Sequence, residues 1–286
     1  LFHKAFWGVV MFKIFTFRQL AFLSFFICII MLFSALLNAL SPILTANASA
    51  NIKVPIVMYH QICDNSALWG DYVIPLKDLE EDFIYFKEND ITPISLAQLQ
   101  AFVLSGEPLP EKCIVITFDD GQKSFLTKVV PLLEKYGYPA NINIVGSLTQ
   151  LYTQNGDCND RYAYLNEADI ITLSKNPLVE IGCHSHNLHS LGTRRGASRL
   201  PGESDNDYKS AILNDISSFN SIYSSLTHNK PTIYAYPYGI RNDFLLQTLK
   251  EQGFTITLSC RESVNTLSKG TSLFDLGRFN RPYGIN

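Results

Sequence analysis

Along residues 51–286, short runs of apolar and β-branched residues alternate with segments whose apolar residues recur three or four positions apart. The first pattern is typical of buried β-strands and the second of helices that bury one face. The predicted strands are Ile52–Tyr59, Ile91–Ile94, Ile114–Ile116, Asn141–Val145, Val179–Cys183, Thr232–Tyr236, Thr255–Ser259 and Leu273–Phe279. The predicted helices are Lys77–Glu88, Leu96–Leu104 with Ser95 as its cap, Gln122–Tyr136, Asn166–Ser174, a segment with apolar positions from Ile212 to Leu226, and Phe244–Glu251.

This order of strand and then helix recurs roughly seven or eight times, which favours an α/β fold with a parallel sheet and helices outside it, open or closed into a barrel. Two polar stretches are predicted as surface excursions instead, Ser147–Tyr164 and the arginine-containing Leu191–Asn206. In parallel α/β folds the functional groups gather where the strands end, at their carboxyl-terminal edge.

Side chains capable of chemistry follow several of these strands directly. The strand at Ile114–Ile116 leads to two adjacent aspartates, Asp119 and Asp120, and then to Gly121. Because neighbouring side chains on an extended chain point opposite ways, the two carboxylates can serve different partners. An aspartate that only caps the following helix is the alternative interpretation. The residues of this kind at predicted strand ends are His60, Asp119, Asp120, His184, His189 and Tyr238.

A histidine-rich segment, Gly182-Cys-His-Ser-His-Asn-Leu-His189, follows another short apolar run. His184 and His189 are five positions apart, so they do not share a helix face and can converge only in an irregular loop. One carboxylate and two imidazoles are sufficient to hold a catalytic divalent metal while leaving positions open for water and substrate. Together with the aspartate pair, the segment therefore indicates a metal site, and a metal-free surface loop is the alternative.

The amino-terminal end differs from the rest of the chain. Leu20–Leu37 is an uncharged apolar run; Lys4, Lys13 and Arg18 precede it, and no further basic residue follows until Lys53. This asymmetry predicts a cytoplasmic amino terminus, with everything beyond the run outside the membrane. Both a cleaved signal peptide and a retained anchor that contacts the membrane through residues 20–37 fit its length.

Small residues at Ala46–Ala50 have the spacing of a signal cleavage site. A start at Met11 would give a more ordinary signal peptide than a start at Leu1, so the sequence leaves open which of the two is the true first residue. We therefore expect residues 1–50 to be a signal peptide or anchor with its linker, and residues 51–286 to be an exported, monomeric working domain. Its location would be secreted or at the outer face of the cytoplasmic membrane.

Charge and cysteine content give no support to nucleic-acid binding, a disulfide framework or a thiolate metal site. The formal net charge of −3 gives no reason to expect nucleic acid as a partner. Five of the six cysteines fall in the predicted exported domain, an odd number with no Cys-x-x-Cys pair among them. Neither a disulfide framework nor a thiolate metal site is therefore indicated.

Four motifs together resemble those of the polysaccharide deacetylases with a NodB-type domain, the carbohydrate esterase family 4. They are Pro55-Ile-Val-Met-Tyr-His60, Thr117-Phe-Asp-Asp-Gly121, His184-Ser-His-Asn-Leu-His189 and Ala235-Tyr-Pro-Tyr-Gly239. The first and third look most like the branch of exported poly-β-1,6-N-acetylglucosamine deacetylases of biofilm formation. The resemblance covers about residues 52–284 and implies a distorted (β/α) barrel of about seven parallel strands.

What the resemblance implies for the site can be assigned residue by residue. Asp120, His184 and His189 would hold a divalent metal, zinc first, with cobalt, nickel and iron(II) as alternatives. Asp119 would be the general base and His60 the general acid. The backbone N–H of Tyr238 would contribute to an oxyanion hole.

The sequence also departs from the family pattern. Many relatives have an arginine where Ala235 stands, and Arg278 could take over its role beside the catalytic aspartate. His186 is expected to be a bystander or to support the metal ligands indirectly. Stacking on sugar rings is a further expectation for Tyr236, Trp69 and Tyr72, with packing in the core as the alternative for each.

The expected function is removal of N-acetyl groups from a polysaccharide of N-acetylglucosamine. Poly-β-1,6-N-acetylglucosamine is favoured over peptidoglycan and chitin-like glycans. Two alternatives remain open at this point: an esterase for O-acetyl groups on a xylan-type polysaccharide, and a surface protein that binds glycan without catalysis.

Overall fold

The computed structural model describes residues 25–34, 51–190, 192 and 194–285, and the chain divides into two units, Leu1–Ser49 and Ala50–Asn286. In the first unit residues 25–34 are helical, whereas the remainder of the predicted apolar run and the predicted cleavage site lie outside the described residues. No helix within the described part of the chain is long and apolar enough to cross a membrane.

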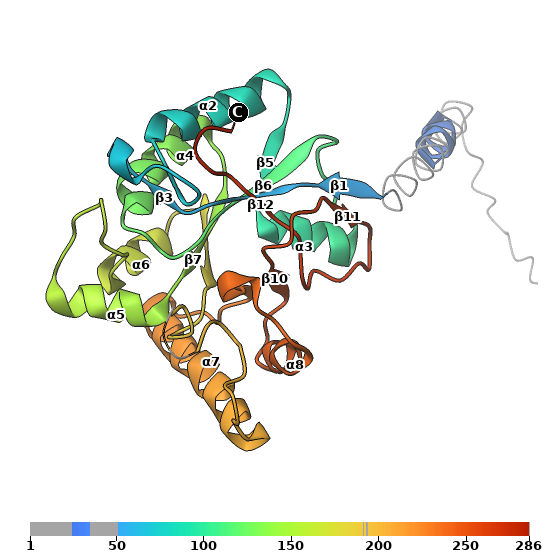
Figure 1. Cartoon of the computed structure of the whole chain (residues 1–286). Helices are drawn as coiled ribbons and strands as arrows, with labels where there is room; N and C mark the ends of the chain where they lie inside the picture. The colour runs from blue at the N-terminus through green and yellow to red at the C-terminus, as the bar shows by residue number, and fades with distance from the viewer. Residues whose placement is uncertain (1–24, 35–50, 191, 193, 286) are drawn as a thin grey trace, which may run out of the picture. The chain divides into compact units, whose positions relative to one another are not determined.

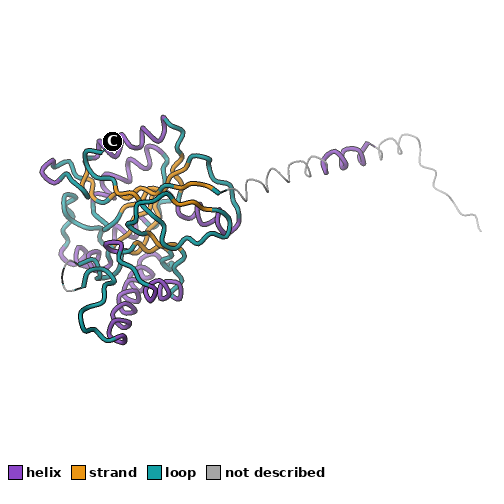
Figure 2. Tube along the Cα trace, turned by 45° about the vertical axis from the view of Figure 1, so that its right-hand side comes forward, coloured by secondary structure: helices purple, strands orange, loops and turns teal. Residues whose placement is uncertain are grey.

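The second unit is built on one curved sheet of parallel strands with helices around it (Figures 1 and 2). The strand order is β10-β9-β8-β7-β6-β2-β12, with β5 also paired to β6, and every one of these pairings is parallel. The strands are β2 (Ile56–Tyr59), β5 (Thr92–Ile94), β6 (Cys113–Phe118), β7 (Ala140–Ile144), β8 (Val179–Cys183), β9 (Ile233–Ala235), β10 (Ile256–Leu258) and β12 (Phe279–Asn280). The predicted parallel barrel is thus confirmed as a half-barrel sheet.

Helices and minor strands complete this unit. The helices are α2 (Leu76–Glu88), α3 (Leu96–Ser105), α4 (Val130–Tyr136), α5 (Gly146–Asn155), α6 (Glu167–Leu173), α7 (Asp205–Thr227) and α8 (Asp243–Glu251). The minor strands are β1 (Ile52–Val54), antiparallel to β11 (Asn265–Leu267), and β3 (Gln61–Ile62), parallel to β4 (Val73–Ile74). Single turns at Ser66–Leu68 and Pro237–Gly239 are 3-10 helical, and Phe125–Val129 is π-helical.

The two faces of the sheet pack against two separate cores. On β6, Ile116 and Phe118 join the larger core, whereas Cys113 and Val115 join the smaller one, together with the apolar residues of α3. This alternation follows from the period of two along a strand. Asp119 continues the series of Cys113 and Val115, so its side chain falls on the face of the smaller core.

Local sequence signals explain where helices begin. The Ser95 side chain accepts a hydrogen bond from the Gln98 N–H, and Gln98 Oε1 accepts one from the Ser95 N–H, which forms a capping box at the start of α3. Asn166 and Asp169 form the same arrangement at the start of α6. The predicted cap at Ser95 is therefore confirmed.

Two predicted elements are wrong. Ser147–Tyr164 is not a loop throughout, because α5 occupies its first part; the buried positions of α5 include Gly146 and Thr149, which give no apolar periodicity to detect. Leu273–Phe279 is not a continuous strand, since Asp275 has a φ of 67° and interrupts the extended chain. Only an isolated bridge between Leu258 and Leu276 and the short β12 remain of it.

Candidate active site

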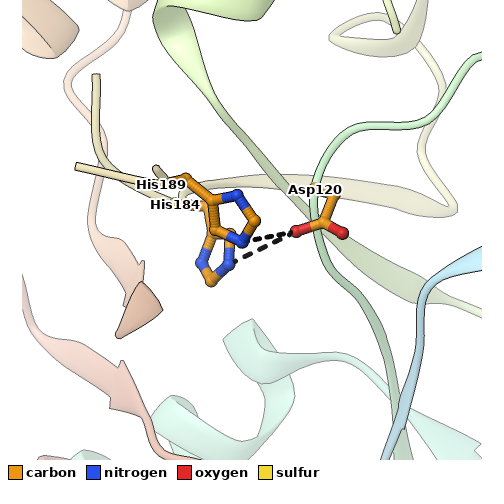
Figure 3. Close-up of side chains that lie close together, drawn as sticks. All are labelled: Asp120, His184 and His189. Atoms are coloured by element: carbon orange, nitrogen blue, oxygen red, sulfur yellow. Dashed lines mark ion pairs between the residues drawn. The ribbon is translucent and has the colours of Figure 1, made fainter. Parts of the chain in front are cut away.

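Asp120, His184 and His189 converge at the carboxyl-terminal edge of the sheet (Figure 3). Asp120 follows β6, and both histidines follow β8. The Nε2 atoms of His184 and His189 lie 3.5 and 3.1 Å from Asp120 Oδ1. Each residue offers one ligand atom, and these three atoms lie within 4.8 Å of one another, a suitable arrangement for one cation.

The protonation of these side chains fits a metal ion. His184 Nδ1 lies 2.9 Å from the Ala235 carbonyl oxygen, and because a carbonyl only accepts, Nδ1 must carry the hydrogen. This leaves a lone pair on His184 Nε2, the nitrogen that faces Asp120. Within the described residues, Asp120 Oδ1 is buried and receives no hydrogen bond of suitable geometry. A cation would satisfy both atoms.

The backbone turns sharply at the strand ends that carry the site. Asp120 and Ser185 both have a φ of 72°, and Tyr238 has a φ of 57°. A left-handed conformation is unfavourable for residues with a Cβ, by about 1 kcal/mol or more each, and such residues cluster at functional sites. Here the turns follow β6, β8 and β9, and residues of the three segments line one cavity.

Asp119, next to the candidate metal ligand, is held by a buried arginine. Arg278 donates from its two terminal nitrogens to Asp119 Oδ1 and Oδ2, at 2.8 and 2.7 Å, and Asn143 Nδ2 donates to Oδ1 at 2.9 Å. Asp119 and Arg278 are 1% and 0% exposed. Burial alone would raise the pKa of Asp119, but the charge and the hydrogen bonds of Arg278 outweigh it and hold that pKa well below its ordinary value. Asp119 is therefore ionised at neutral pH.

The structure thus places Arg278 in contact with the predicted base, as expected from the absence of an arginine at position 235. Arg278 Nε donates to the Ser259 carbonyl at 2.9 Å, which orients the guanidinium toward Asp119. Ala235 is fully buried at the end of β9, and its carbonyl is used by His184.

His60 follows β2 and lines the same cavity. Its ring lies edge-on to Tyr72, with the ring centroids 4.8 Å apart, and within the described part of the chain its buried Nδ1 has no hydrogen-bond partner. Burial lowers the pKa of His60, and the carboxylates of Asp120 and Asp119 offset only part of this effect. When protonated, His60 is consequently a stronger acid than a histidine in water.

Tyr238 lies in the middle of the Pro237–Gly239 turn, which is closed by a hydrogen bond of 2.9 Å from the Gly239 N–H to the Tyr236 carbonyl. Its ring stacks on His189 with a centroid distance of 4.8 Å and an interplanar angle of 16°. The guanidinium of Arg195 lies over the same Tyr238 ring at 4.6 Å. Gly196 packs on this turn so closely that an added Cβ would meet the Pro237 carbonyl oxygen at 2.7 Å. The loop that carries His189 therefore also holds the Tyr238 turn in place.

These groups line a cavity of about 630 Å³ that is open to solvent. Its walls include the predicted site residues His60, Asp119, Asp120, His184, His189 and Tyr238, and also Met58, Asp71, Tyr72, Arg195, Cys260, Glu262 and Asn280. A volume of this size accommodates a sugar unit with its substituents.

The predicted sugar contacts have different outcomes. Tyr236 is fully buried and its hydroxyl lies 3.0 Å from Thr257 Oγ1, so its ring has no face open to a sugar and that prediction is wrong. Tyr72 lines the cavity and is 60% exposed. Trp69 is half-buried and lies outside the cavity wall. His186 is not among the three clustered side chains.

Asp215 supports the loop that carries His184 and His189, a role that the sequence analysis did not predict. From α7 its two carboxylate oxygens accept hydrogen bonds from the backbone N–H groups of His186 and Asn187, at 2.9 and 2.6 Å. Asp215 is buried between Ile212 and Phe219, two positions of the predicted apolar face. An acid within an apolar helix face was the available signal, since a buried carboxylate requires partners.

Fold and site together place the chain among the α/β half-barrel proteins that have a candidate metal centre at their strand ends. The sequence profile of the polysaccharide deacetylases matches residues 106–257, more than half of the chain. The chain therefore belongs to the polysaccharide deacetylase family, a family of hydrolases, as the resemblance of its motifs predicted.

Relatives agree with this family. The chain is 26% identical to the poly-β-1,6-N-acetyl-D-glucosamine N-deacetylase of Escherichia coli K12, over 76% of this chain and 35% of that protein. It is 24% identical to the protein of the same name from Staphylococcus aureus, over 68% of this chain and 64% of that protein. The chain thus spans about a third of the length of the first relative and less than two thirds of the second.

Solved structures share the fold. A de-N-acetylase from Aggregatibacter actinomycetemcomitans superposes with a TM-score of 0.70 at 23% identity, over 82% of this chain and 97% of that chain. IcaB from Ammonifex degensii gives a TM-score of 0.67 at 18% identity, over 82% of this chain and 94% of that chain.

Proposed function

We propose that the chain is a divalent-metal-dependent hydrolase that removes N-acetyl groups from N-acetylglucosamine units of a polysaccharide. The observation that carries the proposal is the pair of neighbouring aspartates. Asp119 is ionised and fixed by Arg278, while Asp120 joins His184 and His189 in the same open cavity. The names of the relatives favour poly-β-1,6-N-acetylglucosamine as the substrate.

Each side chain answers a specific difficulty of amide hydrolysis, in which the carbonyl is weakly electrophilic and the amine leaves poorly. A divalent cation held by Asp120, His184 and His189 would supply Lewis acidity to polarise the carbonyl and acidify water. Zinc suits this ligand set, and cobalt, nickel and iron(II) are compatible with it. Asp119, with both oxygens oriented by Arg278, accepts the proton of the attacking water.

The remaining groups act on the developing charges. The N–H of Tyr238 donates to the carbonyl oxygen as it gains negative charge, a contribution typically of about 3 kcal/mol for one such donor. His60 donates a proton to the departing amine; its lowered pKa makes the protonated ring a stronger acid, and less of the ring is protonated at neutral pH. No residue has to form an acyl-enzyme, because water is the nucleophile.

The location of the domain is inferred from the amino-terminal sequence. The basic residues before the apolar run of residues 20–37 support export of the domain that follows.

Arg278 bears on the alternative of an inactive glycan-binding protein. The only support for that alternative was the absence of an arginine at position 235, where Ala235 stands. With Arg278 in contact with Asp119, that absence no longer favours inactivity.

The proposal is tested by measuring the acetate that the purified full-length chain releases from glycans. β-1,6-linked N-acetylglucosamine oligomers should release acetate, chelator should abolish the release, and added zinc should restore it. Chito-oligomers, peptidoglycan fragments and acetylated xylan are assayed in parallel. Faster acetate release from xylan than from the N-acetylglucosamine oligomers would show that the chain is an O-acetyl esterase and not an N-deacetylase. Release that is indifferent to chelator, or none from any glycan, would refute the proposal.

A further inference from the structure

Three aromatic side chains lie together at one edge of the catalytic cavity. Tyr72, on its wall, is 60% exposed, and Tyr283 is 44% exposed. The rings of Trp69 and Tyr283 lie against each other with their centroids 4.8 Å apart and a tilt of 39°. The packing of either core does not require these aromatic side chains, since none of the three belongs to a core, although Trp69 is half-buried.

Hydrogen bonds fix this aromatic pair in place. The indole Nε1–H of Trp69 donates to the Cys63 carbonyl at 2.8 Å, which sets the plane of the ring. The N–H of Tyr283 donates to the Gly70 carbonyl at 3.0 Å, and Asn280 Nδ2 donates to the Asp71 carbonyl at 2.7 Å. The segments 69–72 and 280–283 are therefore joined to each other, and the pair is pre-organised rather than loose.

The same two segments are continuous with the cavity. Asp71 and Tyr72 from one segment and Asn280 from the other line its wall, and Trp69 and Tyr283 lie two and three positions from Asp71 and Asn280 in the sequence. Arg281, between Asn280 and Tyr283, is paired with Asp82 at 3.0 Å, so its charge is neutralised. The two segments thus bring aromatic side chains to this edge of the cavity, together with the carboxylate of Asp71 and the amide of Asn280.

We propose that Trp69 and Tyr283 form a glycan subsite that binds sugar units next to the one whose acetyl group is removed. The inference rests on the proposed function, in which the substrate is a polysaccharide. Pyranose rings have apolar C–H faces that pack on aromatic rings, while their hydroxyl and amide groups remain in water. A neutral N-acetylated chain is the ligand, and Tyr72 guides it from the subsite into the cavity.

Dependence of the rate on oligomer length is the kinetic test. For the full-length chain, kcat/KM should rise from the dimer to the hexamer of β-1,6-linked N-acetylglucosamine. Tyr283→Ala should lower kcat/KM on the hexamer by about 3- to 10-fold and leave the dimer unchanged, while Tyr283→Phe, which keeps the ring, should retain the wild-type rise. Tyr85→Ala removes a tyrosine of α2 that is 58% exposed, against 44% for Tyr283, and serves as the control.

Tryptophan fluorescence gives a second measurement that does not depend on turnover. Trp7 and Trp69 are the two tryptophans, so a full-length Trp7→Phe chain reports on Trp69 alone. After removal of metal with chelator, the hexamer should change this emission saturably, and Tyr283→Ala should weaken the binding by the same factor as in the kinetic test.

The two proposals fail in different ways. A Trp69 signal with the hexamer but no acetate release would retain the subsite and refute the deacetylase. Acetate release that does not depend on length, a rise with length that survives Tyr283→Ala, or Trp69 emission indifferent to the hexamer would each overturn the subsite.

Discussion

Arg278 donates one hydrogen bond to each carboxylate oxygen of Asp119, although the two residues are 159 positions apart in the sequence. The guanidinium fork matches the carboxylate in shape as well as in charge. It therefore fixes the direction of both oxygens and, in the proposed function, the direction from which Asp119 approaches water.

Replacing the Arg278 guanidinium by a lysine ammonium group tests this geometry. Arg278→Lys keeps the positive charge but cannot bind both oxygens at once, so we expect kcat/KM for acetate release to fall by about 100-fold or more. Bound metal, measured by mass spectrometry, should not change. Arg281→Lys alters another arginine of the same segment, paired with Asp82, and should leave the rate nearly unchanged; equal losses in both variants would contradict the assigned role.

Removal of the charge should affect stability in a defined pH range. Arg278→Gln leaves a buried carboxylate unpaired, which typically costs about 3–5 kcal/mol in the free energy of unfolding. Because the pKa of Asp119 is depressed in the folded chain, the pair stabilises fully above the unfolded pKa of about 4 and loses its effect only as pH falls through the lower folded value. Urea unfolding of both chains should show the full difference at pH 8 and a smaller one at pH 5, because burial without Arg278 raises the pKa of Asp119 in the variant, and its protonation relieves the unpaired charge. A difference that is equal or larger at pH 5 would contradict an unpaired buried carboxylate in the variant.

Metal affinity should fall in mild acid. Burial lowers the pKa of His189, but Asp120 outweighs it and raises that pKa above 6.5, so a proton on His189 competes with the metal. We expect zinc affinity, measured against a chromophoric chelator, to be full well above this pKa and to decrease as pH falls through it.

One variant of a candidate ligand and one control variant accompany the measurement of zinc affinity. His189→Ala should abolish high-affinity zinc binding at every pH. His228→Asn changes an exposed histidine with a left-handed backbone, a conformation that asparagine tolerates, and should bind zinc like the wild type. Zinc affinity that is constant from pH 5.5 to 8 would contradict the participation of His189.

Asp215 should influence the metal without touching it. Asp215→Asn retains one acceptor for the His186–Asn187 backbone and loses the other, so the loop that carries His189 is less firmly held. We expect zinc affinity to fall by about 10- to 100-fold, with the free energy of unfolding reduced less than in Arg278→Gln. Asp207→Asn, at an exposed position of the same helix, is the control, and an equal effect there would exclude a specific role for Asp215.

Much of this arrangement was predictable because strand ends are visible in a sequence. Val179–Cys183 was predicted with the bounds that the structure has, and Asp120 and His184 follow their strands as expected. Parallel strands then place these side chains at one edge without any further information.

Contacts made across the fold were harder to predict. Tyr236 follows β9 in a pattern that suits both a cavity wall and a core, and only the packing shows that it is buried. The hydrogen bonds from Asp215 to the histidine loop depend on how α7 lies against β8, which no local pattern specifies. Arg278 could be proposed only because the arginine expected at Ala235 was missing.

The late position of Arg278 has a consequence for synthesis. During translation the ribosome produces Asp119, Asp120, His184 and His189 well before Arg278. A nascent or prematurely terminated chain therefore contains every candidate metal ligand while Asp119 still lacks the guanidinium of Arg278. In the proposed function, catalytic competence is acquired when the segment around Arg278 docks, after the candidate metal ligands have been synthesised.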